Sequence, residues 1–303
     1  MRIFITGGTG LIGRRLASHA LEEGHAPVVL TRDPDATRDK LPDGADIVSG
    51  DPTEPGDWQG RIAGCDAVVN LAGEPIFGGR WTAKKKAGIL DSRVKATENV
   101  ARALKELGAG APPLISASAI GYYGPRGDEP LDESAASGND FLAKVSVDWE
   151  AATQPAREAG ARVVRLRIGI VLAKEGGALR ELARPFRFHV GGRVGSGEQW
   201  MSWIHAADLV RAILFLAEAK DLEGAVNGTA PQPATNREFS SEIAKALGRR
   251  SWLPAPRTAL RLLFGEAADP MLNGQRVVPA RLQAAGFDFR FPTLGEALGD
   301  LLG

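Results

Sequence analysis

Three glycines, Gly7, Gly10 and Gly13, follow the apolar residues 2–5 at the start of the chain. The apolar run predicts a β-strand, and residues 11–23 have apolar side chains at helical spacing, so the glycines form a turn between a strand and a helix. Such a turn lets backbone N–H groups and the positive end of the helix approach a phosphate. A tight structural turn is the simpler interpretation, but the strand-turn-helix order favours a dinucleotide site. Its expected phosphate-binding residues are Gly7, Gly10, Leu11, Ile12 and Gly13.

The end of the second expected strand, residues 27–31, indicates which dinucleotide binds. An acidic residue about 20 positions after the glycines would bind the ribose 2′-hydroxyl of NAD, whereas an arginine pairs with the 2′-phosphate of NADP. This chain has Thr31 and Arg32 at that place, and Arg38 adds positive charge nearby. Asp33 stands one position late and precedes a proline, so we expect it to open a turn. Thr31 and Arg32 therefore predict NADP(H); an arginine exposed on a loop without a ligand is the alternative.

The composition indicates a cytoplasmic protein with room for two lobes. Its 303 residues suffice for a nucleotide-binding domain and a smaller lobe. Lys plus Arg and Asp plus Glu each total 37, and this balance offers no basic surface for nucleic acid. The single cysteine, Cys65, cannot form an internal disulfide, and no apolar run approaches the ~18 residues that span a bilayer. We expect no nucleic-acid partner and no membrane partner.

Strand-like and helical segments alternate regularly as far as Arg167, which predicts the α/β class. The expected strands are residues 3–5, 28–30, 46–48, 67–71, 114–117, 162–166 and 225–228, and the main expected helices are residues 11–23, 92–107, 141–159, 206–219 and 236–247. This order predicts a doubly wound parallel sheet of the Rossmann type. We expect residues 1–167 and 208–235 to form the nucleotide-binding domain. The remaining residues, 168–207 and 236–303, are expected to form a lobe that covers the substrate.

Several motifs together resemble the extended short-chain dehydrogenase/reductase superfamily, and within it the atypical branch called epimerase family proteins. The motifs are ITGGTGLIG at the start, NLAGEPI from Asn70, RWTAKKKAGILDSRVKAT from Arg80, ISASAIGYYG from Ile115, DFLAKVSVDWE from Asp140, GSGEQWMSWIHAADLV from Gly195, NGTAPQPATNREF from Asn227 and GQRVVPARLQAAGFDF from Gly274. They cover nearly the whole chain. The resemblance implies an NADP(H)-dependent oxidoreductase with the extended fold of that superfamily.

The resemblance also assigns roles to residues at the strand ends, where open α/β sheets bind ligands. It implies that Asp51 contacts the adenine and that Ser118 is the active-site serine. It also implies that Leu71, Ala72 and Gly73 form the loop along the adenosine ribose and pyrophosphate. Ser116 and Arg167, at the ends of two further strands, complete the expected cofactor-binding set. For Asp51, which precedes a proline, the start of a turn is the alternative.

Two departures from the superfamily pattern concern the catalytic helix. The usual Tyr-x-x-x-Lys pair, in which the lysine lowers the pKa of a tyrosine acid/base, is absent. Phe141 or Leu142 stands where the tyrosine belongs, with no lysine four positions after either. Arg93 stands where the superfamily commonly has an asparagine that braces this helix. It either orients an anionic substrate or pairs with a carboxylate such as Asp91 or Glu133.

Other residues are candidates to replace the missing pair. Ser118, Tyr122 and Tyr123 carry hydroxyls in one segment, and we expect the proton donor among them, with Ser118 and Tyr123 as the named candidates. A phenol in the core is the alternative for either tyrosine. Lys144 either holds the nicotinamide ribose or is a plain surface lysine on its helix.

The glycine-rich region near residue 200 adds aromatic residues but no metal site. Trp200, Met201 and Trp203 either line an apolar pocket over the nicotinamide or pack in the core of the lobe. His205 and Asp208 stand at the start of an expected helix, and we expect them to cap it. No cluster of His, Cys or carboxylate residues has metal-ligand spacing, so we expect no metal.

Three functions fit these residues. The first is an NADP(H)-dependent oxidoreductase that acts on a small carbonyl or hydroxyl compound, and the complete substrate lobe favours it. The second is a non-catalytic protein that binds NADPH and reports redox state to a partner, which the missing tyrosine favours. The third, a nucleotide-sugar epimerase with tightly held NAD, conflicts with Arg32 and with the missing tyrosine. Subunit pairing through helices is common in the superfamily, so a homodimer remains open beside a monomer.

Overall fold

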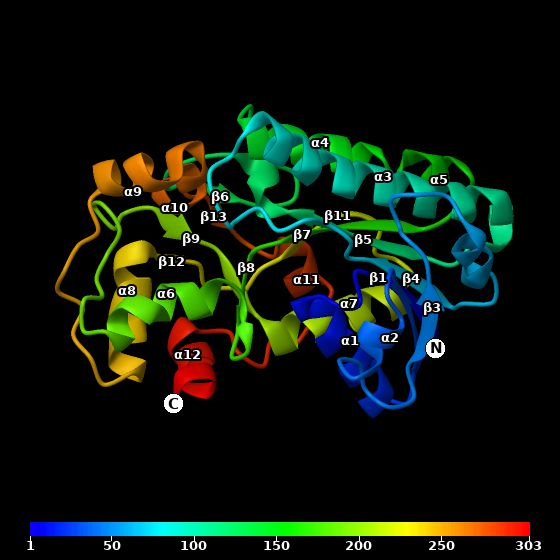
Figure 1. Ribbon diagram of the computed structural model, residues 1–303, viewed down its shortest axis with the longest axis horizontal. Coiled ribbons are helices and arrows are strands. Elements are labelled where there is room, and N and C mark those ends of the chain that lie inside the picture. The colour runs from blue at the N-terminus through cyan, green and yellow to red at the C-terminus, as the bar shows by residue number, and fades with distance from the viewer.

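The computed structural model describes all 303 residues, and its centre is a seven-stranded parallel sheet (Figure 1). The strands lie in the order β3-β2-β1-β4-β5-β7-β11. Their bounds are β1 Arg2–Thr6, β2 Ala26–Thr31, β3 Asp46–Ser49, β4 Ala67–Asn70, β5 Leu114–Ala119, β7 Val163–Ile168 and β11 Gly224–Gly228. The chain order reverses between β1 and β4, so the carboxyl ends of these strands form the crevice where such sheets bind ligands. The predicted α/β class and doubly wound parallel sheet are confirmed.

Helices cover both faces of the sheet, which is why its strands are apolar on both sides. In Figure 1, α3, α4 and α5 lie above the sheet, and α1 and α7 lie below it. The bounds are α1 Leu11–Glu22, α2 Asp35–Arg38, α3 Ala83–Leu107, α4 Phe141–Ala151, α5 Gln154–Glu158, α7 Ala206–Glu218 and α11 Ala280–Ala284, with short 3₁₀ helices η1 Asp57–Ile62, η2 Gly108–Gly110 and η3 Ile120–Tyr123. Neither the 25-residue α3 nor any other helix is long and apolar enough to cross a membrane.

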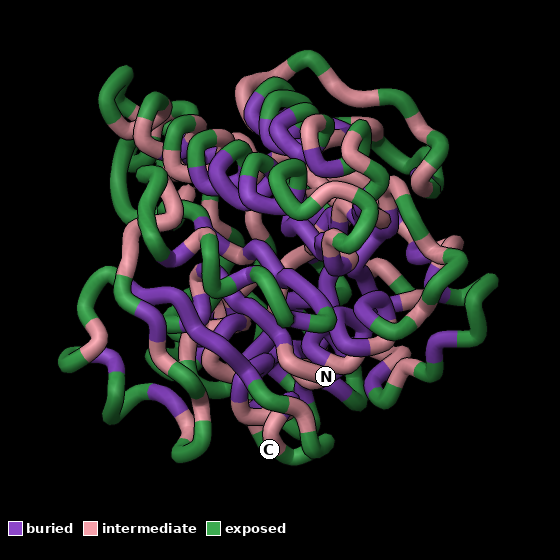
Figure 2. The backbone as a smooth tube through the Cα atoms, turned by 90° about the vertical axis from the view of Figure 1, so that its right-hand side faces the viewer, coloured by how far each residue is buried: buried purple, intermediate pink, exposed green.

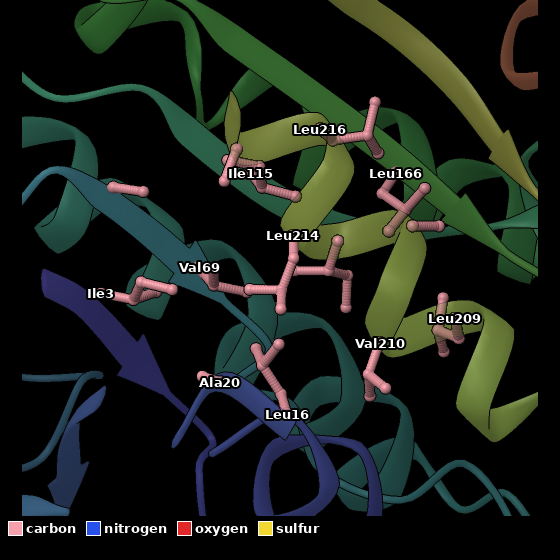
Figure 3. Packing of buried hydrophobic residues seen from close by; sticks show 14 of the residues in the cluster. Ile3, Leu16, Ala20, Val69, Ile115, Leu166, Leu209, Val210, Leu214 and Leu216 are labelled. Atoms are coloured by element: carbon pink, nitrogen blue, oxygen red, sulfur yellow. The ribbon is translucent and has the colours of Figure 1, made fainter. Parts of the chain in front are cut away.

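Successive strand residues point to opposite faces and build two cores. Ile3 belongs to the cluster beneath the sheet, whereas its neighbour Phe4 packs on the α3 side. In the lower cluster, Leu16 of α1 and Leu214 of α7 gather around Val69 of β4 (Figure 3). These contacts fix the strand ends, and with them the loops that follow, on a rigid base.

Two helices differ in their bounds from the expected ones. The expected helix at residues 92–107 is the second part of α3, which begins at Ala83 because the side chain of Thr82 accepts a hydrogen bond from the N–H of Lys85 at 3.2 Å. The expected helix at residues 141–159 is divided into α4 and α5. Pro155 has no N–H to continue the helix, and it stands in the first turn of α5 instead.

The second lobe has short elements around its own buried cluster. Its elements are β8 Ile170–Ala173, α6 Gly177–Arg187, β9 Trp200–Met201, β10 Trp203–His205, β12 Ala234–Thr235, α8 Asn236–Ala246 and α12 Leu294–Leu302. The cluster contains Trp203, Phe239 and Leu298. Figure 2 shows that the buried segments gather in the interior of the molecule and that exposed loops surround them. Leu282 and Phe287, by contrast, pack in the lower core of the sheet. Residues 236–303 therefore contribute to both lobes, and the domain boundary stays a prediction.

A last group of elements lies where the two lobes meet. It contains β6 Pro130–Leu131, β13 Arg276–Val277, α9 Arg257–Phe264, η4 Gly265–Ala268 and α10 Asp269–Leu272. Strands β6 and β13 pair in parallel, while α9 has no buried residue and exposes Leu262 and Leu263. Arg80 donates hydrogen bonds to the carbonyl oxygens of both leucines, and Lys86 pairs with Glu266 of η4. Polar surface contacts therefore hold α9 near the start of α3.

Candidate cofactor and active site

The three glycines of the first turn differ in what surrounds them. Gly7 has a φ of +66°, and a Cβ there would lie 2.6 Å from the backbone carbonyl of Leu71. A Cβ on Gly13 would lie 2.4 Å from the carbonyl oxygen of Gly7. A Cβ on Gly10 would meet only that same oxygen, at 3.2 Å. Gly7 and Gly13 are thus required by packing, whereas the backbone at Gly10, where α1 begins without a side-chain cap, has space for a phosphate.

The end of β2 presents a free arginine beside this turn. Arg32 is exposed and forms no ion pair or side-chain hydrogen bond, whereas Thr31 is buried and bonded to the hydroxyl of Thr37 at 3.0 Å. Asp33 accepts the N–H of Ala36 at 3.0 Å, which is the turn-opening arrangement expected for it. At the end of β3, Asp51 accepts both the N–H and the hydroxyl of Thr53 through Oδ1. Asp51 therefore opens a turn and keeps Oδ2 free for a ligand.

The floor of the crevice between β1 and β4 is a buried chain of hydrogen bonds. Thr6 donates to Oδ1 of Asn70 at 2.6 Å, and Nδ2 of Asn70 donates to Thr97 at 2.8 Å and to Ser116 at 3.2 Å. Trp149 donates to the same Thr97 hydroxyl at 2.9 Å. The network positions the loop of Leu71, Ala72 and Gly73, which follows β4 directly. Ser116, at 1% exposure, supports this floor from within.

Ser118, Glu150 and Arg167 meet beneath the crevice in a buried polar cluster. The guanidinium of Arg167 donates to Oε1 of Glu150 at 2.7 Å and to Oε2 at 3.0 Å, and the hydroxyl of Ser118 donates to Oε1 at 2.8 Å. Burial works to lower the pKa of Arg167, but the hydrogen bonds and charge of Glu150 outweigh it and raise that pKa. Arg167 is permanently charged, and its donors point to residues of the chain.

The two tyrosines differ sharply in their surroundings. Tyr123 is fully buried; its hydroxyl donates to Asn227 at 2.7 Å and accepts from Arg167 at 3.0 Å. Burial raises the pKa of Tyr123, against the charge of Arg167. Tyr122 is half-buried, its ring lies 3.4 Å from the guanidinium carbon of Arg167, and its hydroxyl has no partner within the chain. Of the four hydroxyls in residues 116–123, that of Tyr122 is the one free to meet a ligand.

Helix α4 presents no acid or base where the superfamily has its catalytic pair. A Cβ on Gly121 of η3 would lie 3.3 Å from Cβ of Leu142 and 3.8 Å from the hydroxyl of Ser146, so these two side chains occupy the face toward the site. Ser146 donates to the carbonyl oxygen of Leu142 at 2.9 Å. Lys144 is exposed on the opposite side and bonds nothing.

The lobe places its aromatic residues in different roles. Trp203 is buried in the core, whereas Trp200 and Met201 are half-exposed in β9. His205 caps α7, because its Nδ1 accepts the N–H of Ala207 at 3.1 Å. Asp208 accepts two backbone N–H groups of residues 290 and 291, at 2.9 and 2.8 Å. No group of three or more His, Cys, Asp or Glu side chains is placed to hold a metal ion.

The chain is similar in sequence and in structure to several known proteins. Residues 3–227 match the NAD dependent epimerase/dehydratase family, and residues 255–301 match a domain of unknown function, DUF1731. The epimerase family protein MT2273 of Mycobacterium tuberculosis is 42% identical over 298 residues, 98% of this chain and 96% of that protein. A crystal structure of human epimerase family protein SDR39U1 with NADPH has a TM-score of 0.87 at 33% identity, covering 100% of this chain and 99% of that one. A nucleoside-diphosphate sugar epimerase structure from Corynebacterium glutamicum has a TM-score of 0.81 at 34% identity, with 58% of its chain covered.

Proposed function

The chain belongs to the NAD dependent epimerase/dehydratase family, and from that premise we propose that it is an NADP(H)-dependent oxidoreductase acting on a small carbonyl or hydroxyl compound. The exposed, unpaired Arg32 beside the open backbone at Gly10 is the observation that carries the proposal. An arginine there suits the 2′-phosphate of NADP, and Asp33 is already bonded within its own turn. The NADPH bound to the human relative supports the same cofactor.

The residues around the crevice fit a dinucleotide. A side chain at Gly10 would occupy the space beside the first turn of α1, so the small residue there suits a pyrophosphate held by backbone N–H groups. Leu71, Ala72 and Gly73 follow the buried Asn70 network and run along the same crevice. NADPH, when bound, supplies the hydride. The chain's own residues then have to orient the substrate and move one proton.

Tyr122 is the residue that we infer gives or takes this proton. Its hydroxyl is free, its ring is held from below by the guanidinium of Arg167, and it lies in η3, the short helix that follows β5. Ser118 and Tyr123 remain predicted participants that act inside the buried cluster, where their hydroxyls bond Glu150 and Asn227. Lys144, on the outer side of α4, would need to turn inward to hold a ribose.

A non-catalytic NADPH-binding sensor is the second candidate, and the face of α4 favours it. Leu142 exchanges no proton, and the hydroxyl of Ser146 already donates to a backbone carbonyl. Such a face would be neutral for binding the cofactor and unfavourable for fast catalysis.

One pair of measurements tests both candidates. Calorimetry should give a smaller dissociation constant for NADPH than for NADH, and equal constants would reject the cofactor assignment. NADPH oxidation is then followed against a library of aldehydes, ketones and keto acids. Turnover of any member supports the oxidoreductase, whereas a protein partner that binds only the NADPH-loaded form, with no turnover at all, supports the sensor.

A further inference from the structure

Arg93 lies between the loop after β4 and helix α4. Its guanidinium carbon is 5.1 Å from the ring centroid of Trp149, and Nη1 donates to the carbonyl oxygen of Ile89 at 2.9 Å. A Cβ on Gly73 would come within 3.2 Å of the same guanidinium carbon, so the backbone of Gly73 also packs against the guanidinium of Arg93. Trp149 is itself fixed, because its ring nitrogen donates to Thr97 at 2.9 Å. The guanidinium plane is thus held in position by an aromatic ring and a backbone loop.

Arg93 forms no ion pair within the chain. Glu74, whose charge acts on Arg93, forms its ion pair with Lys85 at 3.4 Å. The two carboxylates that the sequence offered as partners are engaged elsewhere: Asp91 pairs with Lys95 at 3.1 Å, and Glu133 accepts the N–H of Asn227 at 2.9 Å. Burial lowers the pKa of Arg93 to about 10, so the side chain stays charged at neutral pH.

A half-buried guanidinium without a carboxylate in direct contact is unfavourable unless a ligand supplies that contact. Of its five N–H donors, Arg93 uses one within the chain. The remaining donors form a planar fork that matches a carboxylate or a phosphate, and the ring of Trp149 keeps the plane in one orientation. Gly73 is exposed, so the fork can be reached from the crevice.

We propose that Arg93, Gly73 and Trp149 form an anion subsite that binds a carboxylate or phosphate group of the substrate. The inference rests on the proposed function, because it takes the crevice beside this loop as the substrate site. The loop favours the substrate over the cofactor as the source of the anion. Its first residue, Leu71, touches the glycine turn at Gly7, whereas Arg93 lies at its far end beside Gly73. The substrate class is therefore an anionic carbonyl or hydroxyl compound, such as a keto acid, a hydroxy acid or a sugar phosphate.

The test titrates inorganic phosphate and acetate, as separate probes, into the protein with and without saturating NADPH. Calorimetry and tryptophan fluorescence report binding, and the second signal is expected because Trp149 lies under the guanidinium. The parent should bind at least one probe saturably in both forms. Arg93→Gln should weaken this binding by about tenfold or more and change NADPH affinity by less than about threefold. Arg93→Lys should retain part of the probe binding, which guards against a folding defect in the first variant.

Arg102→Gln is the matched control, because Arg102 is exposed on the same helix and bonds nothing. It should bind the probes as the parent does. Unchanged probe binding in Arg93→Gln would overturn the proposal. If saturation with NADPH abolishes probe binding in the parent and Arg93→Gln weakens NADPH itself by about tenfold, the anion is a cofactor phosphate and the substrate assignment is wrong. Failure of the proposed function gives a different result, since a parent that does not bind NADPH can still bind the probes at Arg93.

Discussion

Glu150 and Arg167 form a two-pronged ion pair between α4 and β7, with Nε to Oε1 at 2.7 Å and Nη2 to Oε2 at 3.0 Å. Both side chains are about 95% buried. Each therefore depends on the other, because either charge left alone in the interior would be strongly unfavourable. The pair joins the catalytic helix of the superfamily to the sheet and supports the ring of Tyr122 from below.

Glu150→Gln should destabilise the protein by about 3–5 kcal/mol, because it leaves the buried guanidinium of Arg167 without its counter-charge. Urea unfolding of the two proteins measures this difference. Arg165→Gln is the matched control, since Arg165 is only half-buried and lies 3.8 Å from the same carboxylate. Its loss should cost less than about 1 kcal/mol. Similar losses in the two variants would contradict a dominant role for the Arg167 pair.

Gly10→Val should leave the protein folded and abolish NADPH binding, because the branched side chain would fill the space beside the open backbone. Gly13→Ala should instead act on the fold itself. It should lower the free energy of unfolding by about 1–3 kcal/mol, because the new Cβ overlaps the carbonyl oxygen of Gly7. Circular dichroism and calorimetry separate the two effects. A folded Gly10→Val protein that still binds NADPH tightly would show that the phosphates lie elsewhere.

Arg32→Asp should reverse or abolish the preference for NADPH over NADH. Removing a charge-assisted bond to the 2′-phosphate lowers affinity by about ten- to a hundredfold. Lys40→Asp makes the same change of charge at an exposed position nearby, and it should alter the preference much less. Calorimetric titration of NADPH and NADH into the parent and the two variants measures this preference. An equal change of preference in both variants would show that the general charge of this surface, and not a bond from Arg32, determines it.

Tyr122→Phe should slow NADPH oxidation by about 10²-fold or more without changing stability or NADPH affinity, if the free phenol moves the proton. Tyr123→Phe should mainly reduce stability, because it removes the hydroxyl that bonds both Asn227 and Arg167. Steady-state rates and thermal unfolding of both variants test this division. If Tyr123→Phe and Ser118→Ala are slow yet fully stable while Tyr122→Phe is active, the proton moves through the buried cluster instead.

The stability of the protein should fall as the pH drops below about 6.5, the ordinary value for histidine. Burial lowers the pKa of His205, although the charge of Asp300 works against it. The unfolded chain therefore takes up this proton before the folded protein does, and the loss accumulates as the pH falls towards the lowered pKa. Protonation also removes the acceptor that caps α7. His205→Asn keeps a capping oxygen without titrating, so its urea midpoint should depend less on pH between 7 and 5.

The sequence predicts the sheet and the glycine turn well, because both depend on local signals. Strand residues that are apolar on both faces need helices on both faces, and Gly7, Gly10 and Gly13 have meaning only at a strand-turn-helix junction. The turn at Asp33 was likewise readable from its neighbouring proline. The role expected of Arg32 can also be predicted from its position at the end of β2 alone.

The polar cluster beneath the site was not predicted, since its members are distant in sequence. Nothing in the local sequence marks Glu150 as buried, because glutamate is mostly exposed and its partner Arg167 lies 17 residues further along the chain. The difference between Tyr122 and Tyr123 depends on which ring points inward, and that is decided by Asn227 and Arg167 from other strands. The isolation of Arg93 appears only once Asp91 and Glu133 are seen to be paired elsewhere.

Helix α9 should be among the first parts of the molecule to unfold locally. None of its residues is buried, and the chain holds it by Arg80 at its last carbonyls, Arg257 at Leu272 and an ion pair between Arg261 and Asp269. Contacts of this kind contribute little free energy each, so local unfolding of α9 is inexpensive compared with that of the sheet. Its amide hydrogens should exchange with solvent long before those of β1, β4 and β5. The opening of α9 is then governed by these few surface contacts and not by the stability of the whole protein.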